Sequence, residues 1–220
     1  SISGTTPQTV SHGSDGTAVT AVPDAGYHFV KWSDDVSTAT RTDTGVTGDI
    51  SVTAEFAINT YTVTFKNWNG DEIKTQTVEH GSGATAPDDP TREGYHFTGW
   101  DADFSNVTSD LTVTATFAIN TYTVTFKNWN GDEIKTQTVE HGSGATAPDE
   151  PTREGYSFSR WDVDYTNITG ELTITATYTI NQYTITFNAD GGSDVSPITQ
   201  DYGTTVTAPA SPAKVGYTFD

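Results

Sequence analysis

The strongest constraint on this chain is that it repeats itself. The segment at residues 60–88 recurs letter for letter at 121–149, and the full units around these segments differ at 13 of 61 positions. The outer segments match only the back or the front of a unit, which predicts that the chain is a slice of a longer tandem array. We therefore divide its 220 residues into a divergent, N-terminally incomplete repeat (1–59), two complete repeats (60–120 and 121–181) and a C-terminally incomplete repeat (182–220).

Each repeat is predicted to consist of β-strands. Tyr61, Val63 and Phe65 alternate with threonines, as do the apolar residues of 111–117, and this period of two is typical of half-buried strands. We expect two further strands at 73–79 and 94–100.

The segments between these strands also carry signals. Asn69-Gly70 predicts a hairpin turn after the first strand. The proline-rich segment 81–94 predicts a crossover with at most one short helical turn. A β-bulge at residues 98–99 would bring the ring of Trp100 to the rings of Tyr95 and Phe97.

The fold class that follows is mainly β, with tandem small β-grasp-like repeats of about 61 residues each. The segments 118–121 and 179–182 read as four-residue linkers without glycine or proline, so neighbouring repeats should keep a fixed angle. We expect the repeats to be arranged as an extended rod. Because a unit this small buries only about 60% of its surface, its stability should depend on its aromatic residues and on neighbouring units.

The motif of the complete repeats is similar to that of a known family. The sequence Tyr-Thr-Val-Thr-Phe, then Asn-Gly, then Pro-Thr-Arg-Glu-Gly-Tyr-x-Phe-x-x-Trp-Asp resembles the Listeria–Bacteroides repeat, or internalin B-repeat. Residues 1–59 look like its divergent variant, with Ala21–Tyr27 in place of the Pro-Thr-Arg-Glu-Gly-Tyr box. The resemblance implies a β-grasp-like fold in large secreted or surface-anchored bacterial and archaeal proteins, often as stalks. It implies no enzymatic activity.

Composition excludes several classes of protein. The formal net charge of −19 opposes binding to nucleic acid, whose phosphates would be repelled. No apolar run is long enough to insert into a membrane. The chain lacks cysteine, which removes disulfides, thiolate metal sites and cysteine nucleophiles, and it shows no basic or apolar leader.

No catalytic, cofactor-binding or metal-binding residue is predicted. His12, His80 and His141 share one repeat position before a glycine and read as turn residues after the second strand. Clusters of aspartate and glutamate, such as Asp88-Asp89, could in principle bind calcium, but none matches a known calcium loop, so solvated acidic surface is the preferred interpretation.

Three smaller patterns have a candidate function. Trp68 and Trp129 sit in the hairpin turn, where an exposed ring could contact a glycan or a protein, or could fold back on its own or the next repeat. Asn106 and Asn167 match the N-glycosylation pattern, although a chance match in a threonine-rich chain explains them equally well. An isopeptide bond at Lys66 or Lys127 is disfavoured because these lysines lie beside a polar turn.

These patterns favour a non-enzymatic stalk or spacer of a large extracellular surface protein or adhesin. The alternatives are a glycan- or protein-binding repeat module that uses the turn tryptophans, a self-assembling fibre subunit, and an accessory part of a secreted enzyme. The expected partners are neighbouring repeats of a longer chain, other copies bound head to tail through the incomplete end repeats, and a host or environmental glycan or protein.

Overall fold

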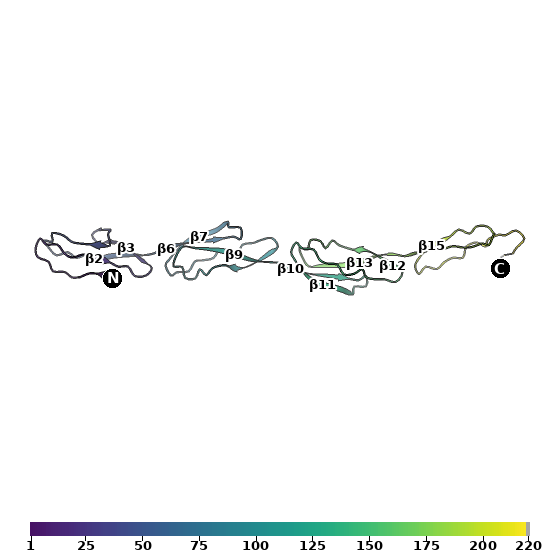
Figure 1. Ribbon diagram of the computed structural model, residues 1–220, viewed down its shortest axis with the longest axis horizontal. Helices are drawn as coiled ribbons and strands as arrows, with labels where there is room; N and C mark the ends of the chain where they lie inside the picture. Colours follow the sequence, from purple (N-terminus) through teal and green to yellow (C-terminus); the bar gives the residue numbers. More distant parts are fainter. Residues whose placement is uncertain (219–220) are drawn as a thin grey trace. The chain divides into compact units, whose positions relative to one another are not determined.

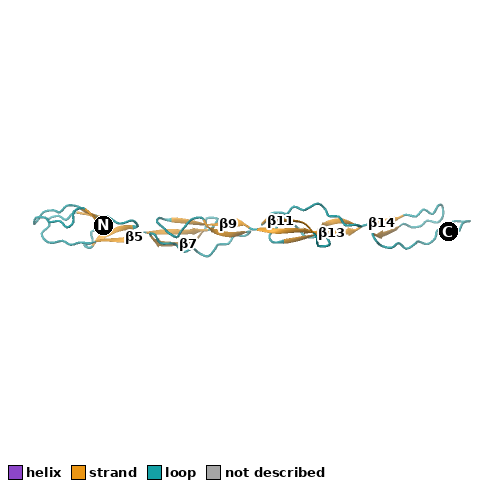
Figure 2. Cartoon of the chain, turned by 90° about the horizontal axis from the view of Figure 1, so that it is seen from below, coloured by secondary structure: helices purple, strands orange, loops and turns teal. Residues whose placement is uncertain are grey.

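The computed structural model describes residues 1–218 and contains strands and loops but no helix in that range (Figure 2). Phe219 and Asp220, with which the predicted fourth repeat ends, lie outside the described residues. The chain separates into two compact units, Ser1–Ala118 and Ile119–Asp220. Each unit contains one complete and one incomplete repeat.

The complete repeat of the first unit is a four-stranded mixed sheet. Its strands are β6 (Thr60–Lys66), β7 (Glu72–Glu79), β8 (Tyr95–Trp100) and β9 (Leu111–Ile119), and Figure 1 labels β6, β7 and β9. Their order in the sheet is β7-β6-β9-β8. The central strands β6 and β9 are parallel, with Val63 opposite Leu111 and Phe65 opposite Val113. This arrangement confirms the four predicted strands and the β-grasp-like sheet.

The hairpin turn between β6 and β7 lies where Asn-Gly predicts it. The N–H of Asn67 donates to the carbonyl of Asp71 at 2.8 Å, and the N–H of Gly70 donates to the carbonyl of Asn67 at 2.9 Å. The turn requires φ of +89° at Gly70, a conformation that glycine adopts without steric strain.

The complete repeat of the second unit has the same architecture. Its strands lie in the order β11-β10-β13-β12. They are β10 (Thr121–Lys127), β11 (Glu133–Glu140), β12 (Tyr156–Trp161) and β13 (Leu172–Ile180).

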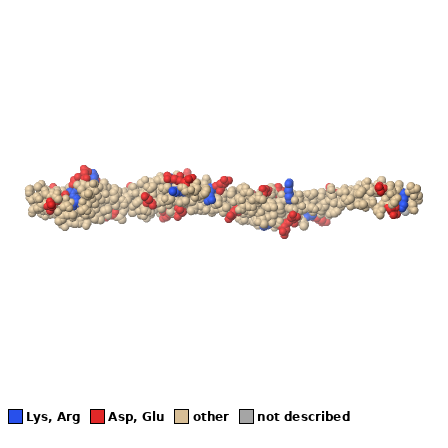
Figure 3. All heavy atoms as spheres, turned by 45° about the horizontal axis from the view of Figure 1, so that its top comes forward, with Lys and Arg blue, Asp and Glu red and all other residues tan. Residues whose placement is uncertain are grey.

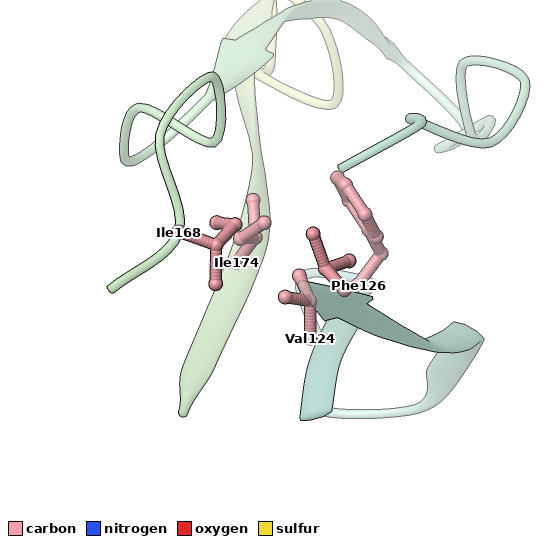
Figure 4. Packing of buried hydrophobic residues seen from close by; sticks show 5 residues of the cluster. Val124, Phe126, Ile168 and Ile174 are labelled. Carbon is pink, nitrogen blue, oxygen red and sulfur yellow. The ribbon is translucent and has the colours of Figure 1, made fainter. Parts of the chain in front are cut away.

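The hydrophobic core of each complete repeat lies where the parallel central strands meet the loop before the last strand. In the second unit it is built by four side chains that are at most 2% exposed, and these point toward one another in Figure 4: Val124, Phe126, Ile168 and Ile174. Val63, Phe65, Val107 and Val113 form the matching cluster of the first unit. Ile168 and Ile174 of the second-unit cluster take the places of the smaller Val107 and Val113, and all four side chains are buried.

A bulge of the predicted kind is present in the third strand of the second unit's complete repeat, but of the two ring contacts predicted for Trp100 only that with Phe97 is found. In β12 the pairing shifts by one residue between Phe158 and Arg160, and the ring of Phe158 lies 5.4 Å from that of Trp161. The equivalent pair in β8, Phe97 and Trp100, has the same separation. Tyr95 does not join this pair, because the turn before β8 places the guanidinium of Arg92 against its ring instead.

The incomplete repeats form smaller sheets. In the first unit, β1 (Ile2–Ser3), β2 (Val19–Ala21) and β4 (Thr40–Arg41) form one sheet, whereas β3 (Tyr27–Trp32) pairs with β5 (Ala54–Ile58). In the second unit β14 (Gln182–Ile185) pairs with β15 (Ile198–Asp201). The described residues of these repeats lack the parallel central pair of the complete repeats.

The predicted four-residue linkers are in fact single residues. Strand β13 stays paired up to Ile180, opposite Tyr156, and β14 begins at Gln182, so Asn181 alone connects them. In the same way Asn59 alone connects β5 to β6, and Asn120 alone separates the end of β9 from the start of β10. Residues of the predicted linkers are therefore recruited into the strands.

Candidate functional site

The two turn tryptophans lie at the tips of their hairpins and are half exposed. Trp68 is 50% exposed and Trp129 is 51% exposed, whereas Trp32 is 3% exposed. The backbone N–H of Trp68 donates to Oδ1 of Asn67 at 2.8 Å, and Trp129 repeats this bond with Asn128 at 2.9 Å. The rings are thus carried by a turn that the sequence holds rigid.

Each turn tryptophan is stacked on an arginine that the sequence analysis did not single out. The guanidinium carbon of Arg92 lies 4.3 Å from the ring centre of Trp68 and 3.6 Å from that of Tyr95. Arg153 lies 4.3 Å from Trp129 and 3.7 Å from Tyr156. Such cation–π contacts stabilise exposed sites by about 0.5–1 kcal/mol each. They pin the hairpin turn to the start of the third strand.

The stacked arginines keep their hydrogen-bond donors free. Among the described residues, neither Arg92 nor Arg153 forms an ion pair or donates a side-chain hydrogen bond to a protein acceptor. A guanidinium carries five N–H donors in one plane. Aromatic rings contact the guanidinium carbon, while its N–H donors have no protein acceptor among the described residues.

In the complete repeat of the second unit the stack has a third ring. Arg153 also lies 5.8 Å from the ring of Tyr178, whose hydroxyl donates to Oδ1 of Asn128 at 2.7 Å. Burial of the phenol raises the pKa of Tyr178, and the nearby Arg153 opposes that rise. Phe117 occupies the equivalent position of the other complete repeat and lacks this hydroxyl.

The fourth repeat replaces this stack with an ion pair. Asp190 and Lys214 follow Trp68 and Arg92 by 122 residues each, two repeat lengths. The Nζ of Lys214 lies 3.6 Å from Oδ2 of Asp190 and donates to the carbonyl of Asp190 at 2.6 Å. It also lies 4.8 Å from the ring of Tyr217. The cation is therefore retained at this position, but a carboxylate neutralises it.

A second notable site is the junction between repeats within each unit. In the first unit the N–H of Asn59 donates to the carbonyl of Gly26 at 2.7 Å, and its carbonyl accepts from the N–H of His80 at 2.8 Å. Its side-chain Oδ1 lies 2.8 Å from Nδ1 of His28. A single residue is thus bonded to both repeats.

The junction of the second unit follows the same scheme. Asn181 donates to the carbonyl of Gly155 at 2.9 Å and accepts from the N–H of Tyr202 at 2.8 Å. Its Oδ1 accepts from the hydroxyl of Ser157 at 2.6 Å. Tyr202 also donates its hydroxyl to Glu154, a bond that raises the pKa of Tyr202.

The histidine after the second strand has a packing role that the sequence analysis missed. His80 and His141 lie in turns as predicted, and so does His12. The ring of His80, however, packs 5.9 Å from that of Tyr61 and lies directly against Gly26. No pattern within one repeat signals this contact, because its two sides come from different repeats.

The acidic residues act mainly as local hydrogen-bond acceptors. Asp103 accepts from the N–H of Ser105 at 2.8 Å, which lowers the pKa of its carboxyl group, and Asp164 accepts from Thr166 with the same effect. Within residues 1–218, no three His, Asp or Glu side chains gather in a group that could hold a metal ion. Acidic and basic residues are scattered over the face shown in Figure 3.

The remaining predicted positions lie at the surface or at strand ends. Asn106 and Asn167 are exposed in matching loops, and each precedes a residue that is 2% exposed. Lys66 and Lys127 end the strands β6 and β10. None of these residues joins the tryptophan–arginine stacks or the junctions.

The first repeat contains a buried arginine that the sequence analysis also missed. Arg41 stacks 5.2 Å from the ring of Trp32 and donates to both carboxylate oxygens of Asp34 at 2.9 and 3.0 Å. It also donates to Asp43. It borders a cleft of about 910 Å³, but its charge is already neutralised by these two carboxylates.

Two family models match this chain. The family model described as Divergent InlB B-repeat domain matches residues 1–60. The model described as Listeria-Bacteroides repeat domain matches residues 61–120, 122–182 and 183–220.

Several relatives share these repeats. A protein of Evansella cellulosilytica whose name describes it as a membrane protein is 33% identical over 186 residues, which is 76% of this chain and 28% of the relative. A second protein of that organism, described as a Gly-rich membrane protein, is 30% identical over 79% of the chain and 22% of its own length. Internalin H of Listeria monocytogenes is 42% identical over 34% of the chain and 15% of its own length. The chain therefore spans less than a third of the length of these relatives.

Among solved structures, the type 2 repeat of the mucus binding protein MUB from Lactobacillus reuteri matches 56% of this chain with all of its own. Its sequence identity is 14% and its TM-score is 0.18. Within residues 1–218, the structure has no helix long and apolar enough to cross a membrane.

Proposed function

Since the chain belongs to the Listeria-Bacteroides repeat family, with a divergent InlB B-repeat at residues 1–60, we propose that it is a structural spacer without enzymatic activity. In this proposal it forms part of the stalk of a large extracellular surface protein or adhesin. Relatives described as membrane proteins and as an internalin support a location at the cell surface.

The observation that carries the proposal is the one-residue junction. A spacer must keep its repeats at a defined distance under thermal motion, and flexible linkers of glycine and serine do not do so. Asn59 and Asn181 are instead bonded to the repeats on both sides through backbone and side chain. Each junction leaves its connecting residue little freedom to rotate.

Small-angle X-ray scattering on the 220-residue chain tests this function. A compact globule of this length has a radius of gyration of about 17 Å, whereas four beads in line give about 28 Å. We expect the larger value. A value near 17 Å would contradict the spacer.

Two double variants test whether the junctions keep the chain extended. The double variant Gly26→Ala and Gly155→Ala places a methyl group inside both junctions. Gly70→Ala with Gly131→Ala is the matched control, because these glycines also have positive φ but face open space. We expect the junction variant alone to show the scattering of a flexible chain, with near-UV circular dichroism of folded repeats in both. Identical scattering from both variants would show that the junctions do not hold the repeats apart.

A further inference from the structure

We propose that the Trp68–Arg92 and Trp129–Arg153 stacks are two copies of a binding site for a glycan in which a carboxylate-bearing sugar is linked to a neutral sugar. The carboxylate binds the edge of the guanidinium, and the neutral sugar lies on the open face of the indole. This binding role is separate from the spacer role and does not depend on it.

The arginine is suited to a carboxylate by its geometry. The N–H edge of a guanidinium matches a planar carboxylate through two parallel hydrogen bonds. The guanidinium carbon of Arg92 lies 4.3 Å from the ring centre of Trp68 and 3.6 Å from that of Tyr95, so contacts with two rings restrict the side chain before a ligand arrives. A side chain ordered in advance loses less entropy on binding.

The tryptophan supplies an apolar surface beside this edge. Arg92 covers one face of the Trp68 ring, and half of the side chain is still exposed. Exposed aromatic rings that are rigidly held provide large contact area at a low entropy cost. Because the guanidinium carbon lies 4.3 Å from the centre of the indole ring, a ligand that contacts both the cation and the exposed ring needs an acidic group and an apolar sugar surface side by side, which a two-sugar unit provides.

The fourth repeat shows that the hairpin turn can be attached to the third-strand segment without a tryptophan–arginine stack. There Asp190 and Lys214 join the same two segments by an ion pair. A carboxylate at the tryptophan position is therefore compatible with the fold, and the chain has 29 acidic residues against 10 basic ones. The complete repeats nevertheless leave Arg92 and Arg153 without a carboxylate partner among the described residues. This arrangement leaves two cations available to an external anion.

The overall charge of the chain further limits which acidic glycans can bind. A net charge of −19 repels polyanions such as sulfated polysaccharides. At 0.1 M salt this repulsion is screened beyond about 10 Å, so a single carboxylate that contacts Arg92 directly is governed by its immediate surroundings. The site therefore favours a glycan with one acidic sugar over a highly charged polymer.

Titration of the full chain with sialyllactose tests the proposal, because this probe carries one carboxylate on a sugar linked to neutral lactose. We expect saturable quenching of tryptophan fluorescence and chemical-shift changes at the indole N–H groups of Trp68 and Trp129. Lactose, acetate and heparin are the comparison ligands, and each should bind at least tenfold more weakly.

Three variants assign the binding. Arg92→Gln with Arg153→Gln should weaken it at least tenfold, whereas Arg160→Gln, which removes an exposed arginine outside the stacks, should leave it unchanged. Trp68→Asp with Trp129→Asp imitates the fourth repeat, so the hairpin turn stays attached while the cation is neutralised, and binding should be lost.

Several binding results would contradict the proposal. Absence of saturable binding to sialyllactose, or full binding by the aspartate variants, overturns it. If lactose binds as tightly as sialyllactose, the arginine does not contribute to binding. If acetate binds as tightly, the neutral sugar does not contribute. Tighter binding of heparin contradicts the preference for a single carboxylate.

Discussion

The imidazole of His80 occupies the space that any side chain at position 26 would need. A Cβ atom built on Gly26 would lie 2.2 Å from Cδ2 of His80, and one built on Gly155 would lie 1.8 Å from Cδ1 of Tyr202. Both glycines also have positive φ, of 81° and 74°. A glycine before the third strand is thus required twice over, by its own backbone and by the following repeat.

The first prediction separates these two requirements. Gly26→Ala introduces both a strained φ and an overlap with His80, whereas Gly70→Ala introduces the strained φ alone, because nothing lies within 4 Å of its Cβ position. Overpacking destabilises by about 1–3 kcal/mol. We expect Gly26→Ala to lose that much more free energy of unfolding than Gly70→Ala in urea titrations. Equal losses would mean that His80 moves aside freely.

The second prediction concerns the core. Phe65 is fully buried and packs 5.1 Å from Trp100 and 5.2 Å from Phe104, ring centre to ring centre. Phe65→Ala should lower the free energy of unfolding by about 3–5 kcal/mol. Ile73→Ala, at a position that is 37% exposed, should lose less than about 1 kcal/mol. Similar losses from the two variants would contradict the assigned core.

The third prediction concerns pH. Hydrogen bonds from the backbone of Ser105 and Thr166 lower the pKa of Asp103 and Asp164 from the ordinary value of 3.8. A carboxyl group with a lower pKa in the folded state stabilises the protein above its unfolded pKa, and this contribution is lost as pH falls through the folded value. Stability should therefore decline below about pH 4, and Asp103→Asn with Asp164→Asn should flatten that decline. Urea midpoints between pH 2.5 and 5 provide the measurement, and an unchanged slope in the double variant would refute it.

The fourth prediction concerns ions. The excess of acidic residues destabilises the folded chain through mutual repulsion, which salt screens. The melting temperature should rise modestly with sodium chloride, and calcium at equal ionic strength should add little more. A sharp gain at sub-millimolar calcium that a chelator abolishes would instead identify a calcium site.

The fifth prediction concerns association between copies. Tyr183 and Ile185 of β14 are 57% and 37% exposed, although the equivalent Val63 in β6 is fully buried beside its parallel neighbour. An exposed strand edge with apolar side chains invites pairing with another chain. We expect head-to-tail oligomers at high concentration in sedimentation equilibrium, weakened by Ile185→Lys. A strict monomer at all concentrations would exclude this association.

The strands of the complete repeats were predictable because their signal is local. Alternation at Tyr61, Val63 and Phe65 and the turn at Asn69-Gly70 depend only on neighbours in sequence. The stack of Trp68 on Arg92 was not, since the two residues are far apart in sequence and meet only when the crossover returns to the hairpin. The junction role of Asn59 was not predictable for a similar reason, because its hydrogen-bond partners belong to two repeats.

The first repeat was the least predictable part. Its sheet of β1, β2 and β4 pairs strands of two or three residues, too short for alternation to be recognised. Arg41 looks like an ordinary surface cation in the sequence, and only the fold brings Asp34 and Asp43 around it.

Every complete repeat contains both halves of the junction seen within the units. A histidine follows its second strand, and a glycine precedes its third strand. A gene that duplicates such a segment therefore creates a new boundary without needing any new compensating mutation. Deleting a copy is equally harmless, because the residues brought together are the same ones. The length of such an array can thus change in whole steps of 61 residues, by recombination between near-identical copies, and each new boundary has the same glycine and histidine in its sequence.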